Sequence, residues 1–172
     1  MLEGLRALQQ DPATQVLALV SKPPAEAVVR SILEQVAASN KPTVICFLGG
    51  DGEMLADVPH VTPARTLQEC ALLAAQAVKP ELGNIKAYLE KEEIHLAEQA
   101  AGIKKKLNKE QRYLRGLFSG GTLCYEAQVL WKGMLSAPIH SNAPLPGGSS
   151  LADSTKSHEH TAVDLGEEEF TV

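Results

Sequence analysis

Apolar positions in the first 80 residues follow two alternating spacings, which predict helices and strands in turn. Leu2, Leu5 and Leu8 recur every third residue, so the chain should open with a short amphipathic helix. The run VLALV, residues 16–20, is continuously apolar, the pattern of a strand buried on both faces. Apolar residues then step by 3, 1, 3, 1, 3 over residues 25–36, which predicts a helix.

The order of a buried strand followed by a helix occurs a second time. KPTVICFLGG, residues 41–50, reads as a second buried strand, and a helical stripe follows over residues 67–78. Strand, helix, strand and helix joined by short connections predict a parallel sheet covered by helices, the α/β class. We place this first domain at residues 1–79.

The pattern changes after residue 79. Residues 80–112 are rich in Glu and Lys with thin apolar spacing, which predicts an exposed helical connector. Lys104, Lys105 and Lys106 could form a phosphate patch, but acidic residues just upstream favour an ordinary solvated helix face.

A second α/β unit is predicted over residues 113–172. LRGLFSGGTLCYEAQVLW, residues 114–131, reads as a strand, a corner and a helix. Pro, Gly and Ser dominate residues 136–160, which we expect to be a long mobile loop, and residues 161–172 suggest a terminal strand or β-arm. A strand and a helix alone cannot bury their own faces, so this unit is predicted to be the opening of a second similar domain.

Composition excludes several classes of protein. The 172 residues are 44% hydrophobic with a formal net charge of −5, so the chain lacks the basic field that holds nucleic acid. Apolar runs are far too short to span a membrane, and the N-terminus does not read as a signal peptide. Cys46, Cys70 and Cys124 are widely spaced, which predicts reduced core thiols in a cytoplasmic protein.

The corner Ser119, Gly120, Gly121, Thr122 is the strongest candidate site. A helix N-terminus presents free backbone N–H groups and a partial positive charge, and glycines let an anion approach them. The competing interpretation is a tight turn that needs glycine for a positive φ. Spacing alone leaves both open. The corner is not a P-loop, because Thr122 stands where the lysine belongs.

Other candidate residues are weaker. GGDGEM, residues 49–54, lacks the third glycine of a dinucleotide fingerprint and reads as a turn. HEH, residues 158–160, lacks a third metal ligand nearby in sequence, so no metal site is expected. His60 and His95 are isolated. Cys124 fits core packing better than a thiol activated by the helix dipole.

Two stretches resemble a known superfamily. Residues 5–49, LRALQQDPATQVLALVSKPPAEAVVRSILEQVAASNKPTVICFLG, resemble the flavodoxin-like ligase domain of succinyl-CoA synthetase α subunits. RGLFSGGTLCYEA and DLGEEEFTV, residues 115–127 and 164–172, are similar to FdrA proteins, which are acyl-CoA synthetase-like. This resemblance implies a subunit serving acyl or carbamoyl transfer with phosphate, as in oxamate carbamoyltransferase of purine and allantoin breakdown.

Three departures from that family change what we expect of this chain's ligands and site. The Rossmann CoA-binding domain is missing, which implies a central fragment or truncated relative without CoA, with phosphate or a phosphorylated ligand possible. The Gly-His-Ala-Gly loop that carries a phosphohistidine in the synthetases is missing too, and His60 does not match it. The first corner reads Ser21-Lys22-Pro23-Pro24, and proline has no N–H to offer an anion.

These departures leave Ser119, Gly120, Gly121 and Thr122 as the surviving anion site. The expected partners are other enzyme subunits or the missing domains, in an oligomer, without nucleic acid or membrane. The alternative is a non-catalytic structural or assembly subunit.

Overall fold

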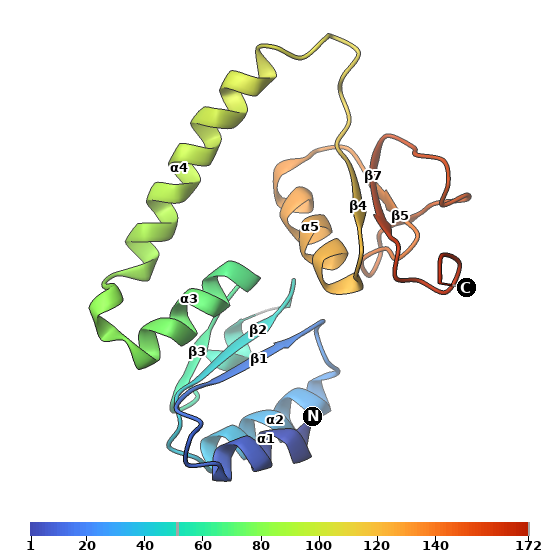
Figure 1. The fold of residues 1–172 in the computed structure, drawn as a ribbon. Helices are drawn as coiled ribbons and strands as arrows, with labels where there is room; N and C mark the ends of the chain where they lie inside the picture. The colour runs from blue at the N-terminus through green and yellow to red at the C-terminus, as the bar shows by residue number, and fades with distance from the viewer. Residues whose placement is uncertain (51, 172) are drawn as a thin grey trace. The chain divides into compact units, whose positions relative to one another are not determined.

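The computed structural model describes residues 1–50 and 52–171, which form two compact units. The units comprise residues 1–102 and 103–172. Each contains a parallel sheet flanked by helices, so the prediction of a flavodoxin-like α/β fold is confirmed (Figure 1). Asp51, in the turn predicted over residues 49–54, lies outside the described residues.

The first unit has a three-stranded sheet in the order β1-β2-β3, with every pairing parallel. Its elements are α1 (Leu2–Gln10), β1 (Leu17–Ser21), α2 (Glu26–Ala37), β2 (Thr43–Phe47), the short 3-10 helix η1 (Glu53–Leu55), β3 (Val61–Pro63) and α3 (Leu67–Val78). The helix predicted over residues 67–78 has those bounds in the structure.

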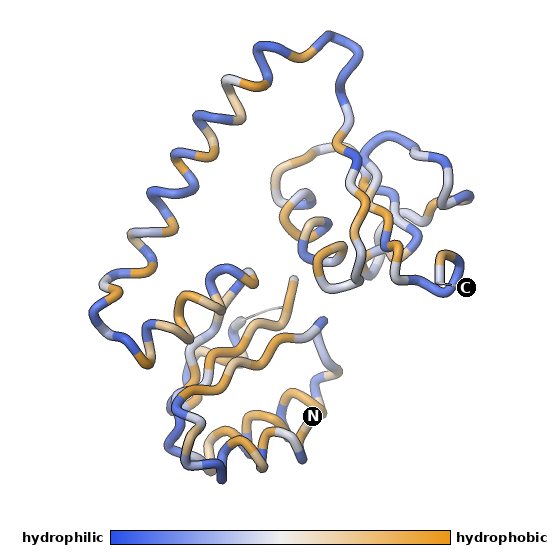
Figure 2. The backbone as a smooth tube through the Cα atoms, viewed as in Figure 1, coloured by the Kyte–Doolittle hydropathy of each residue, from blue (hydrophilic) through white to orange (hydrophobic). Residues whose placement is uncertain are grey.

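The core of this unit lies between the sheet and the pair α1 and α2. Strand β2 is central and all five of its residues are buried, as a continuously apolar strand should be. Ile45 and Phe47 point to the face that α1 and α2 cover, where they pack with Ile32 and Val36. Figure 2 shows the apolar character of these strands against the mixed character of the helices.

Strand β1 departs from the prediction. It is the edge of the sheet and is not buried on both faces: Ala18 is exposed and Val20 keeps 42% of its surface accessible. Helix α3 contacts β1 and β2 but leaves these two side chains uncovered. The sequence pattern could not distinguish an edge strand from a central one, because both read as an apolar run.

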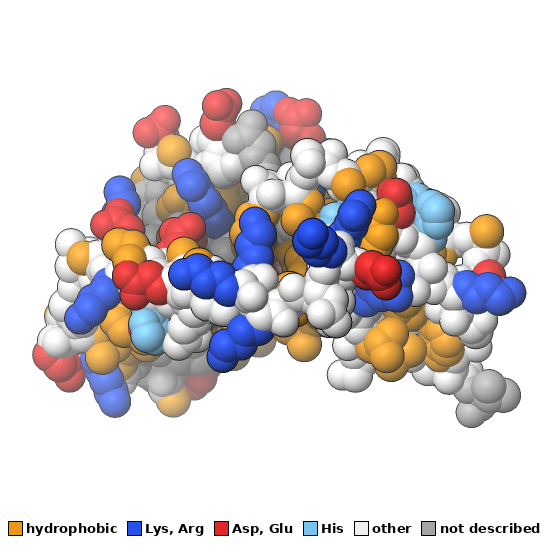
Figure 3. All heavy atoms as spheres, turned by 90° about the horizontal axis from the view of Figure 1, so that it is seen from above, with side chains coloured by type: hydrophobic (Ala, Val, Ile, Leu, Met, Phe, Trp, Pro, Cys, Tyr) orange, Lys and Arg blue, Asp and Glu red, His pale blue; other side chains and the backbone are white. Residues whose placement is uncertain are grey.

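After α3 the chain forms the 3-10 helix η2 (Pro80–Leu82) and the long helix α4 (Ile85–Lys104). Ile85 is the one buried residue of α4, so most of this helix is accessible to solvent. Acidic and basic side chains are interspersed with apolar ones on the face drawn in Figure 3. Among the described residues, no helix has both the length and the apolar content needed to cross a membrane.

The second unit holds a four-stranded sheet in the order β4-β7-β5-β6, again all parallel. Its elements are β4 (Arg115–Phe118), α5 (Gly121–Met134), β5 (Ile139–Ser141), β6 (Ser149–Ser150) and β7 (His160–Asp164). Strand β7 pairs with the inner edge of β4, and β5 and β6 extend the sheet beyond it, so β4 and α5 do not stand alone in this unit.

Two of those strands come from the segment expected to be a loop. Residues 136–160 contain β5 and β6, and the presumed terminal arm is β7, a central strand whose five residues are all buried. Short strands with Ser, His and Pro around them give no alternating pattern, so only their pairing reveals them. The mobility of residues 136–160 stays a prediction.

We expect Ile45→Ala to lower the free energy of unfolding by about 2–5 kcal/mol, because it leaves a cavity in the packed face of β2. Val20→Ala, on the exposed face of the neighbouring strand, should cost well under about 1 kcal/mol. Urea unfolding followed by far-ultraviolet circular dichroism measures both. Equal losses in the two variants would show that the exposed face of β1 is covered in solution.

Candidate functional site

The Ser119–Thr122 corner joins the end of β4 to the start of α5. Gly120 is the N-cap, with φ −169° and ψ 141°, and Gly121 is the first helical residue. Any residue adopts that extended conformation, so the turn itself does not demand glycine at position 120. A Cβ atom placed on Gly120 would meet no other atom within 4 Å. The backbone at this corner is therefore open to approach from outside.

Helix α5 also differs from the other helices at its N-terminus. The first turns of α1, α2 and α3 contain Glu3, Glu26 and Glu69, respectively. The side chain of Thr66 caps α3, and that of Asn84 caps α4. Among α1 to α5 in the described chain, α5 alone has neither an acidic first turn nor a side-chain cap. Its first N–H groups keep the partial positive charge that attracts anions.

The corner lies at the carboxyl edge of the sheet, beside the end of β7. Leu165 N–H donates to Phe118 O at 2.7 Å, which ties the segment after β7 to the end of β4. A Cβ on Gly166 would lie 3.7 Å from both Gly120 Cα and Ser119 O, so this glycine packs against the corner. Ligands of open parallel sheets bind at this edge, where chain segments diverge from neighbouring strands.

Asp164 ends β7 and is the acidic group nearest this edge in the sheet. Its side chain is only 2% exposed, and its Oδ1 accepts the Gly166 N–H at 2.9 Å. Asn142, directly after β5, bonds to the Asp164 backbone through both ends of its amide, at 2.9 Å each. Sequence reasoning missed both residues, because their segments were read as a loop and a terminal arm.

Glu169 extends this polar network towards solvent. Its carboxylate accepts Ser154 Oγ–H at 2.6 Å and Asn142 Nδ2–H at 2.8 Å. These hydrogen bonds, Ser154 first and then Asn142, hold the pKa of Glu169 below its usual value. Of these two carboxylates, Asp164 is the one connected to the corner, through Gly166, and its negative charge opposes a bare anion there.

The first corner fails for a different reason from the one predicted. Pro23 and Pro24 lie before the N-cap Ala25, so they do not remove N–H groups from the first turn of α2, which begins at Glu26. The Glu26 carboxylate, paired with Arg30, instead places negative charge at that helix start. The prediction that prolines abolish the site was wrong in mechanism, but the charge still disfavours an anion there.

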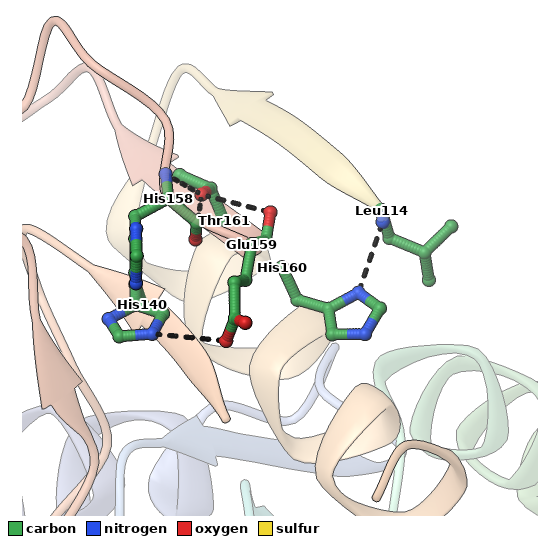
Figure 4. A network of polar contacts seen from close by, with 6 residues as sticks. All are labelled: Leu114, His140, His158, Glu159, His160 and Thr161. Atoms are coloured by element: carbon green, nitrogen blue, oxygen red, sulfur yellow. Dashed lines mark hydrogen bonds and ion pairs between the residues drawn. The ribbon is translucent and has the colours of Figure 1, made fainter. Parts of the chain in front are cut away.

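A second group of chemically capable residues lies near the amino end of β7. The parallel pairing of β5 with β7 sets His140 opposite Thr161, just past His158 and Glu159 (Figure 4). His140, His158 and Glu159 each offer one ligand atom, and these atoms all lie within 4.8 Å of one another. The argument that HEH has no third metal ligand was therefore wrong, because β5 supplies one.

The remaining candidate residues have structural roles or belong to neither the glycine corner nor the His140 group. His160 is buried, accepts the Leu114 N–H through Nδ1 at 3.1 Å, and packs edge-on to Tyr113. All three cysteines are buried and none forms a disulfide, and burial raises the pKa of Cys70. His60 and His95 are remote in sequence from both groups, and His60 is exposed with φ 62°.

A cavity of about 380 Å³ lies near the amino ends of β5 and β6, lined in part by Gln128, Lys132 and Gly148. None of the four corner residues lines it. Gln128 spans this region by donating to Ala143 O at 3.0 Å and accepting the Leu145 N–H at 3.3 Å. The hydrogen bonds of Gln128 therefore form part of the wall of this cavity.

Fold and site together define an α/β chain of two parallel sheets with an uncapped glycine corner at the carboxyl edge of the second. No family model matches the chain. It is 38% identical over 175 residues to the uncharacterized protein YahF of Escherichia coli (strain K12). The match covers 99% of this chain and 32% of YahF, so the chain spans about a third of that relative's length.

Glu159 has φ 48°, a left-handed conformation that costs a residue with a side chain about 1–2 kcal/mol. Its carboxylate lies 3.9 Å from His140 Nε2 at a partly exposed site, where such a pair contributes little. In metal-free buffer, Glu159→Gly should therefore raise the free energy of unfolding by up to about 1 kcal/mol.

Urea unfolding followed by Trp131 fluorescence reports on this unit. The control is Glu159→Ala, which removes the carboxylate but keeps the left-handed backbone, and should change stability by less than about 0.5 kcal/mol. A glycine variant less stable than the alanine variant would contradict the assignment of strain to this position.

Proposed function

We propose that this chain is part of an FdrA-like subunit related to acyl-CoA synthetases, and that it binds a small anion at Ser119, Gly120, Gly121 and Thr122. The observation that carries the proposal is the open, uncapped start of α5. Two glycines stand there although the backbone of Gly120 is extended, which favours close approach of a ligand over a turn requirement.

The acidic surroundings refine the class of ligand. The Asp164 carboxylate, which accepts the Gly166 N–H beside the corner, disfavours inorganic phosphate alone. A ligand that also carries an amide can turn its N–H₂ towards this acidic side while its anionic end meets the N–H groups of α5. Carbamoyl phosphate and oxamate combine an amide with an anion. We therefore propose carbamoyl or acyl transfer rather than the phosphohistidine chemistry of the synthetases, in a cytoplasmic protein that has further enzyme subunits as partners.

The alternative is a non-catalytic assembly subunit, favoured by the apolar side chains that the chain leaves exposed. Ile94 and Ile103 on α4 are 63% and 60% exposed, and Leu117 on β4 is 73% exposed. Apolar surface of this kind marks contact sites when it is contiguous. In this reading the glycine corner is only a turn.

Gly121→Pro should weaken carbamoyl phosphate or oxamate binding by roughly tenfold or more, because it deletes one charge-assisted hydrogen-bond donor worth about 1.5–3 kcal/mol. Proline is tolerated as the first helical residue and after an extended Gly120, so the variant should fold. Isothermal titration calorimetry measures the affinity, with circular dichroism as the check on folding.

The matched control is Glu26→Pro, which makes the same change at the first residue of α2. It should leave the affinity for these ligands unchanged. If the folded Gly121→Pro variant binds as the parent does, or if the parent binds neither ligand, the corner is only a turn and the assembly subunit becomes the better account.

We expect no phosphohistidine to form when the chain is incubated with ATP and Mg²⁺, because no Gly-His-Ala-Gly sequence is present to carry one. Radiolabelled ATP followed by acid and base treatment measures this. An acid-labile, base-stable phosphate on any of the five histidines would contradict it.

A further inference from the structure

The group His140, His158 and Glu159 is arranged as a set of metal ligands. His140 Nε2 and Glu159 Oε2 are 3.9 Å apart, beyond hydrogen-bond distance, and the two imidazole rings meet edge-on with centroids 4.6 Å apart. Figure 4 shows His140, His158 and Glu159 on one side of β7, with His160 pointing the other way to Leu114. The polar atoms therefore converge, and His140 and Glu159 meet at ion-pair distance without a hydrogen bond.

The backbone holds two of these ligands in place. Thr161 Oγ1 accepts the His158 N–H at 3.0 Å and donates to His158 O at 2.9 Å, which fixes the turn before β7. Within that turn Glu159 has φ 48°, where glycine would be unstrained. A glutamate kept in a strained position points to a use for its carboxylate, and the nearest groups are the two imidazoles.

The third ligand is positioned by the sheet. His140 is the middle residue of β5 and lies between Ser149 of β6 and Thr161 of β7. Its side chain is 17% exposed and that of Glu159 is 36% exposed, while His158 is exposed. A cation held there would have protein on one side and solvent on the other.

We propose that His140, His158 and Glu159 bind one divalent transition-metal ion, with zinc the best fit. Two imidazole nitrogens and one carboxylate oxygen are a ligand set that Zn²⁺ takes, at about 2.0–2.2 Å each, with water in the fourth position. Tetrahedral bonds of that length set ligand atoms about 3.4 Å apart. The present separations, all within 4.8 Å, would have to close to about that distance when the metal binds.

Binding would join the turn before β7 to β5, so the metal has a structural effect independent of the glycine corner. The ion pair of Glu159 with a protonated His140 is the competing explanation of the same cluster. The two explanations differ in whether a metal binds with defined stoichiometry.

The test uses the full chain without an affinity tag, titrated with Zn²⁺ by calorimetry and with Co²⁺ by visible absorption. We expect one ion per chain and the visible bands of four-coordinate cobalt. Thiolate charge-transfer bands in the near ultraviolet should be missing, because the three cysteines are buried away from solvent.

His158→Ala and Glu159→Gly should each weaken Zn²⁺ binding by at least about tenfold, since even outer residues around a metal contribute about 10–100-fold. His158 lies in an exposed turn and glycine suits the backbone of Glu159, so both variants should fold. The control His95→Ala removes an exposed histidine of α4 and should leave the affinity unchanged. Zinc should also raise the melting temperature of the parent but not of the two ligand variants.

The proposal is overturned if the folded parent binds no zinc. It is equally overturned if binding survives His158→Ala and Glu159→Gly unchanged, or if the cobalt spectrum shows thiolate ligands. In the first case the cluster is an ion pair only.

Discussion

The second unit depends on the insertion of β7 between β4 and β5. This strand is the last one in the described residues, yet it pairs in parallel with both neighbours and buries all five of its residues. Without it, β4 and β5 would be unpaired along their inner edges, and backbone groups there would lose their hydrogen bonds. Because its partner β4 lies over forty residues earlier, this pairing also closes the longest loop of the unit.

Both candidate sites follow from that strand. Its carboxyl end brings Gly166 and Asp164 to the glycine corner that starts α5, and its amino end brings His158 and Glu159 to His140. One end combines backbone N–H donors with carboxylates, and the other combines imidazoles with a carboxylate. The two ends therefore suit ligands of opposite charge, a small anion and a metal cation.

The sequence predicted those features that depend on local pattern. The helix over residues 67–78 and the buried strand β2 follow from apolar spacing, and the Ser119–Thr122 corner follows from a strand, two glycines and a helix. β1 was misjudged because an edge strand can be as apolar as a central one. β5 and β6 were missed, and the terminal strand was not expected to be the central strand β7, because these pairings join distant segments and leave no local pattern.

The candidate sites also combine residues that the sequence pattern reveals with residues that only long-range strand pairing brings together. Gly120 and Gly121 are visible in the sequence, whereas Asp164, Asn142 and His140 acquire their roles only through β7. The prolines of the first corner misled the prediction because their effect depends on where α2 begins, and helix ends are the least certain part of a sequence pattern. The positive φ of Glu159 gives no signal in the sequence, since glycine or asparagine would be the expected residue there.

The central claim is that the start of α5 receives an anion through its backbone. The most direct measurement is a titration of the ¹⁵N-labelled chain with oxamate, followed by amide chemical shifts in two-dimensional NMR. The account predicts saturable shifts of the Gly120, Gly121 and Thr122 amides, with little change at Glu26 and Ala27 of α2. Amides at residues 120–122 that stay fixed at saturating oxamate, or shifts confined to α2, would contradict it.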